Sequence, residues 1–133
     1  MRIFLIDDSL AFLKVAARFL REGLRDEVMI VGQETDCETA LAQVAEMRPN
    51  IILLDLNMPG LNGLDAIPLL RARLPQAHII ALTLLEANGY RAAALDAGAD
   101  AFVSKSNMGN GLLPVIRQLM SLRWEAATGG WAC

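Results

Sequence analysis

The feature that most constrains the fold is a fivefold alternation of short apolar runs and longer amphipathic stretches. The runs have the length and composition of β-strands, and the stretches place apolar residues at helical spacing. The predicted strands are residues 2–6, 27–33, 51–55, 78–83 and 100–105. The predicted helices are residues 10–24, a helix opening at 35–38 and running through 47, one from 62–63 to about 74, 87–98 and 112–127. Strands that alternate with helices over short connections predict an α/β fold, with a parallel sheet covered on both faces.

Local signals set the expected helix ends. Ser9 is placed to cap the first helix, and Thr35–Glu38 reads as a capping box for the second. Ala45 is expected among the inward-facing residues of that second helix. Pro114 is tolerable only in the first turn of the last helix, and the glycine-rich stretch before that helix, residues 106–111, is expected to be loose.

Composition narrows the class of protein. At 133 residues, with 54% hydrophobic and 20% charged residues, the chain is expected to form one domain with a real core. Proteins that bind nucleic acids usually carry excess positive charge, whereas this chain has a net charge of −3, so we do not expect it to bind nucleic acid directly. No apolar stretch approaches the ~20 residues of a membrane helix, and no signal peptide precedes Asp7. Cys37 and Cys133 form no disulfide framework, so a cytoplasmic protein is expected.

Polar residues stand where four of the five predicted strands end. They are Asp7 and Asp8 after the first strand, Asp55 at the end of the third, Thr83 at the end of the fourth and Lys105 at the end of the fifth. In sheets of this kind, ligands bind beyond the carboxyl ends of the strands. The sequence therefore predicts one site built from these five residues.

This set of groups suits phosphoryl transfer. Three carboxylates would repel a phosphate unless a cation lay between them, and oxygen ligands of this kind suit Mg²⁺. A carboxylate on the central strand, Asp55, is already ionised at neutral pH and could act as the nucleophile that forms an acyl phosphate. An ammonium from Lys105 and a hydroxyl from Thr83 could hold the other phosphoryl oxygens.

The chain resembles the CheY-like receiver domain of two-component response regulators. The resemblance covers about residues 1–122 and rests on four motifs in order: IDD at 6–8, LLDLNMPGLNGLD at 53–65, ALT at 81–83 and AGADAFVSK at 97–105. It implies a flavodoxin-like sandwich with strand order 2-1-3-4-5, and receivers of the NarL type are the most similar. Residues 123–133 are expected to be a helix extension and tail, which could be a truncated linker.

The resemblance also assigns roles around the acceptor. Asp55 matches the phosphoacceptor and, with Asp8, a direct Mg²⁺ ligand; Asp7 matches the acid that binds the metal mostly through water. Asn57 matches the position that offers a backbone carbonyl to the metal.

Further positions match the family's switch. Thr83 matches the switch hydroxyl, Lys105 the phosphate-binding lysine and Phe102 the aromatic that turns inward when the threonine moves. Leu84 departs from the small residue that is usual after the threonine, and its bulk is expected to narrow access to Asp55 and slow phosphorylation and hydrolysis.

The implied function is a signalling receiver that accepts a phosphoryl group from a histidine kinase or phosphotransfer protein and catalyses only its own phosphorylation and dephosphorylation. It would be the regulatory domain of a transcriptional regulator. Alternatives are a stand-alone receiver that acts by protein binding, and a receiver that signals by homodimerisation without phosphate. A haloacid-dehalogenase-like phosphatase also forms an aspartyl phosphate, but it would need Asp-x-Asp after the first strand, where this chain has adjacent Asp7 and Asp8.

Overall fold

The computed structural model describes residues 1–84 and 89–132, with side chains described for 1–84 and 89–121. Its five strands form one parallel sheet in the order β2-β1-β3-β4-β5. The strands are β1 (Arg2–Ile6), β2 (Met29–Glu34), β3 (Ile51–Leu54), β4 (His78–Thr83) and β5 (Ala101–Ser104). The α-helices are α1 (Leu10–Leu24), α2 (Cys37–Met47), α3 (Gly63–Arg73), α4 (Tyr90–Ala97) and α5 (Met108–Ala132). The predicted fold class and strand order are confirmed.

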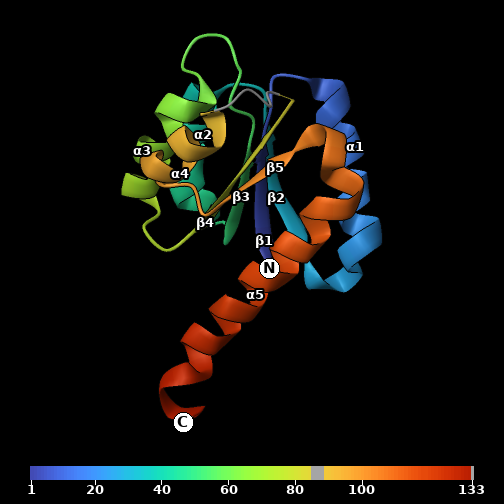
Figure 1. The fold of residues 1–133 in the computed structure, drawn as a ribbon, viewed down its shortest axis with the longest axis vertical. Helices are drawn as coiled ribbons and strands as arrows, with labels where there is room; N and C mark the ends of the chain where they lie inside the picture. The colour runs from blue at the N-terminus through green and yellow to red at the C-terminus, as the bar shows by residue number, and fades with distance from the viewer. Residues whose placement is uncertain (85–88, 133) are drawn as a thin grey trace.

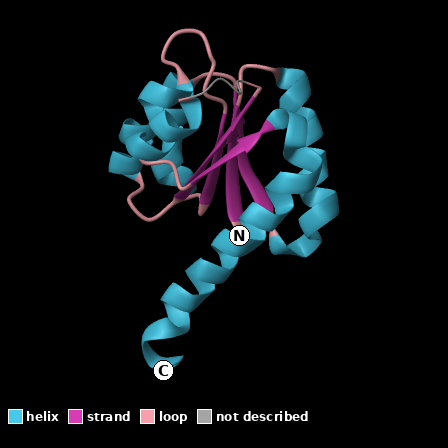
Figure 2. Cartoon of the chain, viewed as in Figure 1, coloured by secondary structure: helices cyan, strands magenta, loops and turns pink. Residues whose placement is uncertain are grey.

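The helices lie in two layers, with the sheet between them (Figures 1 and 2). One core cluster joins the sheet to α2, α3 and α4, and a second joins its other face to α1 and α5. Both faces are covered, so all four residues of the central strand β3 are buried. This explains why β3 reads as an unbroken apolar run rather than an alternating one.

Two of the helix starts test the capping predictions. The Ser9 side chain caps α1 by accepting a hydrogen bond from the backbone N–H of Phe12, as predicted. The cap of α2 is Asp36, which accepts from the N–H of Thr39, so the Thr35–Glu38 capping box was wrong by one residue. Threonine and aspartate are both favoured at the N-cap of a helix, so the sequence alone does not decide between Thr35 and Asp36.

The inward face of α2 also differs from the prediction. Cys37, Ala40, Leu41 and Val44 are buried, whereas Ala45 is exposed. The buried positions follow the i, i+3, i+4, i+7 pattern of a helix, and the next position has already turned toward solvent.

Several boundaries move by a few residues. Strand β2 begins at Met29 because Arg25–Glu27 form a 3₁₀ turn, and the predicted strands 51–55 and 100–105 are shortened to β3 and β5. Helix α4 begins at Tyr90, and residues 87 and 88 of its predicted span lie outside the described residues.

The largest correction concerns α5. It begins at Met108, so most of the glycine-rich stretch 106–111 is helical and Pro114 lies in the second turn rather than the first. A Cβ on Gly111 would meet Asn107 at 3.1 Å and Val103 at 3.5 Å, so the missing side chain lets the helix start close to β5. The helix also continues through residues 128–132, where a tail was expected, because extending an existing helix costs little per residue.

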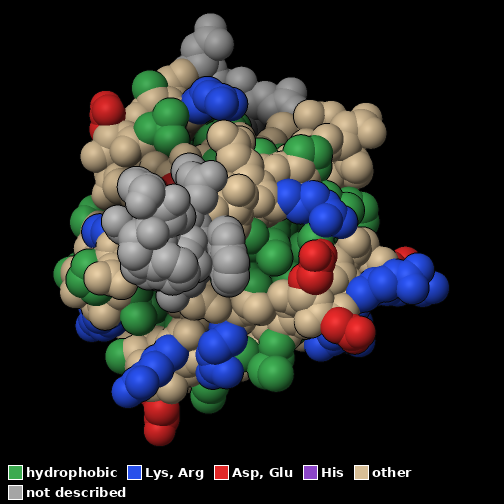
Figure 3. Space-filling view, turned by 90° about the horizontal axis from the view of Figure 1, so that it is seen from below, with side chains coloured by type: hydrophobic (Ala, Val, Ile, Leu, Met, Phe, Trp, Pro, Cys, Tyr) green, Lys and Arg blue, Asp and Glu red, His purple; other side chains and the backbone are tan. Residues whose placement is uncertain are grey.

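The lower end of the sheet carries basic groups. Figure 3 looks at this end from below and shows Lys and Arg side chains spread over it, with acidic ones between them. Arg2 is one example of the chemistry here: its Nε donates to the carbonyl of Met47 at 3.0 Å, at the last turn of α2. Cations favour helix C-terminal ends, where carbonyls lack partners. Among the described residues, no helix is both long and apolar enough to cross a membrane.

Candidate functional site

The carboxyl edge of the sheet brings together the five polar residues predicted from the strand ends. Asp7 and Asp8 follow β1, Asp55 follows β3, Thr83 ends β4 and Lys105 follows β5. The ladder continues past the strand ends into the site: the Asp55 N–H donates to the Ile6 carbonyl at 2.9 Å. The central strands therefore fix the backbone that carries the acidic residues.

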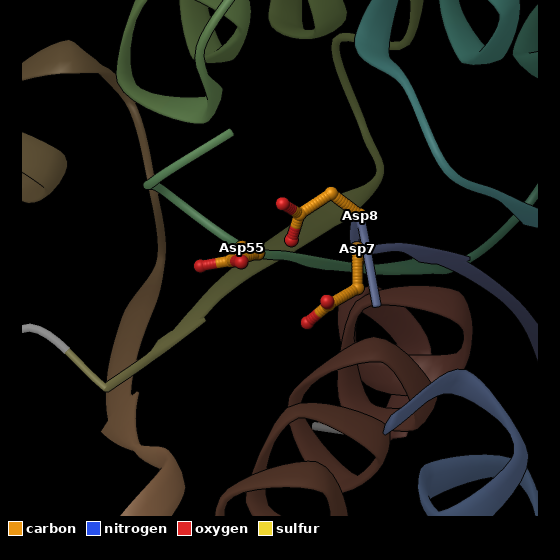
Figure 4. A group of neighbouring side chains, drawn as sticks. All are labelled: Asp7, Asp8 and Asp55. Atoms are coloured by element: carbon orange, nitrogen blue, oxygen red, sulfur yellow. The ribbon is translucent and has the colours of Figure 1, made fainter. Parts of the chain in front are cut away.

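Three carboxylates form the centre of the site (Figure 4). Asp7, Asp8 and Asp55 each offer an oxygen, and these oxygens lie within 4.8 Å of one another. Asp7 is 3% and Asp55 6% exposed, while Asp8 is exposed. A cluster of hard oxygen ligands with one open side fits Mg²⁺, which keeps several of its waters.

Lys105 brings the one cation that contacts these carboxylates in the described structure. Its Nζ lies 2.5 Å from Asp7 Oδ2 and 3.5 Å from Asp55 Oδ2, and its side chain is only 9% exposed. The ammonium thus contacts both acidic residues that follow β1 and β3. A buried cation in this position partly offsets the repulsion among the carboxylates.

The pKa of Asp55 is raised above its ordinary value. Burial is the main cause, and the charge of Asp7 adds to it. The backbone N–H of Asn57, which donates to Asp55 Oδ1 at 3.2 Å, opposes the rise, as do Lys105 and the side-chain hydrogen bond from Thr83. The carboxylate therefore bears an unfavourable charge that a bound cation would stabilise.

Asn57 and Leu84 lie at the rim. Asn57 is exposed, and its backbone supports Asp55 through the hydrogen bond described above. Leu84 follows Thr83 directly and is 71% exposed. Its effect on access to Asp55 stays a prediction.

Phe102 lies in β5, opposite Ala81 of the neighbouring strand. Its ring is partly buried, and the guanidinium of Arg91 on α4 lies 5.9 Å from the ring centroid. Thr83, on the adjacent strand, is 1% exposed. The two predicted switch residues therefore lie on neighbouring strands, one fully buried and the other half-buried beneath an arginine.

The structure adds two residues that the sequence pattern does not single out. Phe12, in the first turn of α1, lies under the Lys105 ammonium, with 4.1 Å from Nζ to the ring centroid. In sequence it is one more apolar position on an amphipathic helix. Gly63 packs so closely that a Cβ there would overlap the Asp55 carbonyl oxygen. The Asn-Gly pair that opens α3 is a sequence signal for that turn, but not for this contact.

The fold and the site can now be compared with those of known protein families. A sequence profile of the response regulator receiver domain matches residues 3–117, and the chain belongs to this family. Regulators rather than catalysts are the common theme of the family, although some relatives are enzymes.

Individual relatives agree with the assignment. The transcriptional activator protein ExaE of Pseudomonas putida is 35% identical over 121 residues, which cover 91% of this chain and 56% of ExaE. The DNA-binding transcriptional activator EvgA of Escherichia coli is 28% identical over 98% of this chain and 59% of its own length. The chain thus spans little more than half the length of these two relatives.

Solved structures show the same architecture. A LuxR-family two-component response regulator from Aurantimonas is 27% identical with a TM-score of 0.83, covering 90% of this chain and 84% of that one. The response regulator domain of Thermotoga maritima CheB is also 27% identical, with a TM-score of 0.78 over 91% of this chain and 96% of that one. The predicted resemblance to receivers of the NarL type is confirmed, and a LuxR-family regulator is among the similar structures.

Proposed function

We propose that Asp55 accepts a phosphoryl group from a phosphohistidine on a histidine kinase or phosphotransfer protein. One observation carries this proposal: Asp7, Asp8, Asp55 and Lys105 converge at the edge of the sheet, where the nearly buried Asp55 lies 3.5 Å from the Lys105 ammonium. A carboxylate in such a site is shielded from water and lies beside a cation, which supports a role as the nucleophile in phosphoryl transfer.

The proposed step is a simple displacement. An Asp55 oxygen forms a bond to phosphorus while the donor's phosphorus–nitrogen bond breaks, and the departing imidazole takes a proton from the solvent. The product is an acyl phosphate, and Asp55 needs no general base because it is already deprotonated.

Asp8 and Asp55, with the Asn57 backbone carbonyl and Asp7 through water, would hold Mg²⁺. When bound, this ion neutralises charge on the transferred group. Lys105, 3.5 Å from Asp55 Oδ2, is near enough to pair with a phosphoryl oxygen. Thr83, which already hydrogen-bonds the Asp55 side chain, would donate its hydroxyl to another.

Movements of Thr83 and Phe102 would transmit the effect of phosphorylation from the site to the protein surface. When the Thr83 hydroxyl turns to the phosphoryl oxygen, the space beside it would admit the Phe102 ring, and the surface of α4, β5 and α5 would repack. The partly buried ring under Arg91 supports an outward starting position. Phosphorylation would bias two existing states rather than create one.

The wider role is that of a regulatory domain. The relatives ExaE and EvgA are named as transcriptional activators, and this chain covers just over half of each. We therefore assign residues 1–122 to the receiver and residues 123–133 to the start of a connection to an output domain, in a cytoplasmic protein that works through protein partners and, in some states, a homodimer. On this proposal the chain itself neither binds DNA nor turns over a separate substrate.

The test is the intact mass of the protein after incubation with Mg²⁺ and acetyl phosphate. We expect one added phosphoryl group in the parent, none in Asp55→Asn, and none in the parent when EDTA removes the metal. A gain that persists in Asp55→Asn, or no gain in any sample, would contradict the proposal.

A further inference from the structure

Among the described residues, the Lys105 ammonium contacts two carboxylates and one aromatic ring. Asp7 and Asp55 are the carboxylates, and Nζ lies over the face of the Phe12 ring, 4.1 Å from its centroid. A cation within ~6 Å of a ring centroid is attracted by the ring's negative face, and the attraction grows when the cation is shielded from water. With its side chain only 9% exposed, Lys105 meets that condition.

Phe12 is itself held in place by the same site. The Asp7 Oδ1 accepts from the Ser9 N–H at 2.9 Å, and the Ser9 Oγ accepts from the Phe12 N–H at 3.1 Å. These contacts form a closed cycle. Asp7 contacts Ser9, Ser9 contacts Phe12, the phenyl group of Phe12 contacts Lys105, and Lys105 contacts Asp7. The N-cap of α1 sets the aromatic ring beneath the lysine.

An uncharged partner suits a lysine that must change partners. If Asp7 turns to the metal and Asp55 carries a phosphoryl group, Lys105 loses the carboxylates that hold it before phosphorylation. A carboxylate at position 12 would compete with the phosphoryl oxygens for the ammonium, whereas a ring attracts the cation without neutralising it.

We infer that Phe12 is a positioning residue for Lys105, keeping the ammonium aimed at the phosphoryl group through its contact with the aromatic face. This inference rests on the proposed function, because it concerns how tightly the same site holds a phosphoryl group.

The test replaces Phe12 with phenylalanines that carry successively more fluorine atoms, which withdraw the negative charge of the ring face while almost keeping its shape. The readout is the affinity of the protein for beryllofluoride, a mimic of the phosphoryl group, in the presence of Mg²⁺. We expect the affinity to fall stepwise with fluorination, by roughly 2- to 30-fold over the series.

Three controls separate charge from packing. The same series at Phe19, half-buried on the same helix, should leave the affinity unchanged. Phe12→Tyr keeps the aromatic face and should bind beryllofluoride nearly as well as the parent. In a Lys105→Met background, fluorination of Phe12 should have no effect, because the cation is gone.

The outcomes keep the two claims apart. If the parent binds beryllofluoride and the affinity stays flat across the Phe12 series, the positioning role is overturned and the proposed function stands. An equal fall with and without Lys105 would also overturn it, since packing alone would explain the loss. If the parent binds no beryllofluoride at all, both the proposed function and this inference fail.

Discussion

At the scale of single residues, Asp55 is held in a state that costs stability. Its carboxylate is almost buried and lies beside Asp7 and Asp8, yet the fold keeps it there. Natural sites often accept such a cost where function needs a charged group in a confined place. The charge that makes Asp55 useful as an acceptor is thus expected to be visible in unfolding experiments.

The first prediction concerns Asp55→Asn in metal-free buffer. Burial raises the pKa of Asp55, so the folded protein keeps a proton there to higher pH than the unfolded chain. Stability therefore falls as pH rises from the ordinary aspartate range through the raised pKa, and the full cost is present above it. At pH 7 we expect Asp55→Asn to melt a few degrees above the parent, with the gap closing on acidification.

The matched control is Asp36→Asn. Hydrogen bonds from the backbone and side chain of Thr39 lower the pKa of Asp36, so its carboxylate favours the fold, and this variant should not gain stability at pH 7. Equal melting temperatures for Asp55→Asn and the parent at pH 7 would show that the buried charge of Asp55 does not destabilise the fold.

Leu84 gives a kinetic prediction at the same scale. The family pattern has a small residue here, whereas this chain has a large side chain next to Thr83. Leu84→Ala should speed both phosphorylation by acetyl phosphate and hydrolysis of the acyl phosphate, measured by intact mass over time. Because the side chain is exposed, its truncation should barely move the melting temperature. Unchanged rates would remove Leu84 from the account.

At the scale of elements, the turn from β3 into α3 determines where Asp55 lies. A Cβ at Gly63 would overlap the Asp55 carbonyl oxygen and come within 2.7 Å of the Leu56 Cα. Backbone atoms cannot move aside as a flexible side chain can. We expect Gly63→Ala to destabilise the fold by about 2 kcal/mol or more in denaturant unfolding.

Gly109 provides the opposite case. It lies inside α5, and nothing lies within 4 Å of the position of its missing Cβ. Gly109→Ala should stabilise the protein by about 0.5–1 kcal/mol, because alanine loses less backbone entropy in a helix. If both glycines tolerated alanine equally, the close approach at Gly63 would be wrong.

A second element-scale device is the arginine that joins α3 to the start of β5. Arg71 donates to the carbonyl of Gly98 at 2.7 Å, to Asp100 Oδ2 at 2.8 Å and to the carbonyl of Ala77. Asp100 in turn accepts from the Ile79 N–H at 2.8 Å. This side chain therefore anchors the C-terminal end of α4, whereas its N-terminal end starts at Gly89 without a side-chain cap.

We expect Arg71→Met to cost about 1.5–3 kcal/mol, since it leaves several half-buried acceptors without their charged donor. Arg73→Met is the control, because Arg73 is exposed and makes one long contact to the Leu69 carbonyl at 3.3 Å. Its change should stay within about 0.5 kcal/mol. Equal losses in chemical denaturation would mean that Arg71 is not an anchor.

At the scale of the whole molecule, alternation of strand and helix predicts the sheet, and parallel strands deliver Asp7, Asp55 and Lys105 to one edge. Which partner Lys105 takes could not be read from the sequence: it pairs more closely with Asp7 than with Asp55. Helix ends were the least predictable part, because Gly109 and Pro114 disfavour a helix locally but are accommodated in α5.

The carboxyl edge of the sheet and the end of α5 lie at opposite ends of the molecule. The carboxyl ends of the strands, after which the acidic residues follow, lie at the upper edge of the sheet in Figure 1, while α5 runs down past the sheet and projects below it. If residues 123–133 connect to an output domain, as proposed, the site and this connection lie at opposite ends of the molecule, and the proposed switch surface of α4, β5 and α5 would carry the signal between them.

The most direct measurement is chemical identification of the phosphorylated residue. After treatment with acetyl phosphate and Mg²⁺, borohydride reduces an aspartyl phosphate to homoserine with release of phosphate, and peptide mass spectrometry locates the change. The account predicts homoserine at position 55 alone, and none in protein that was not exposed to the phosphodonor. Homoserine at position 7 or 8, or at no position while Mg²⁺ is bound, would contradict the assignment of Asp55 as the phosphoacceptor.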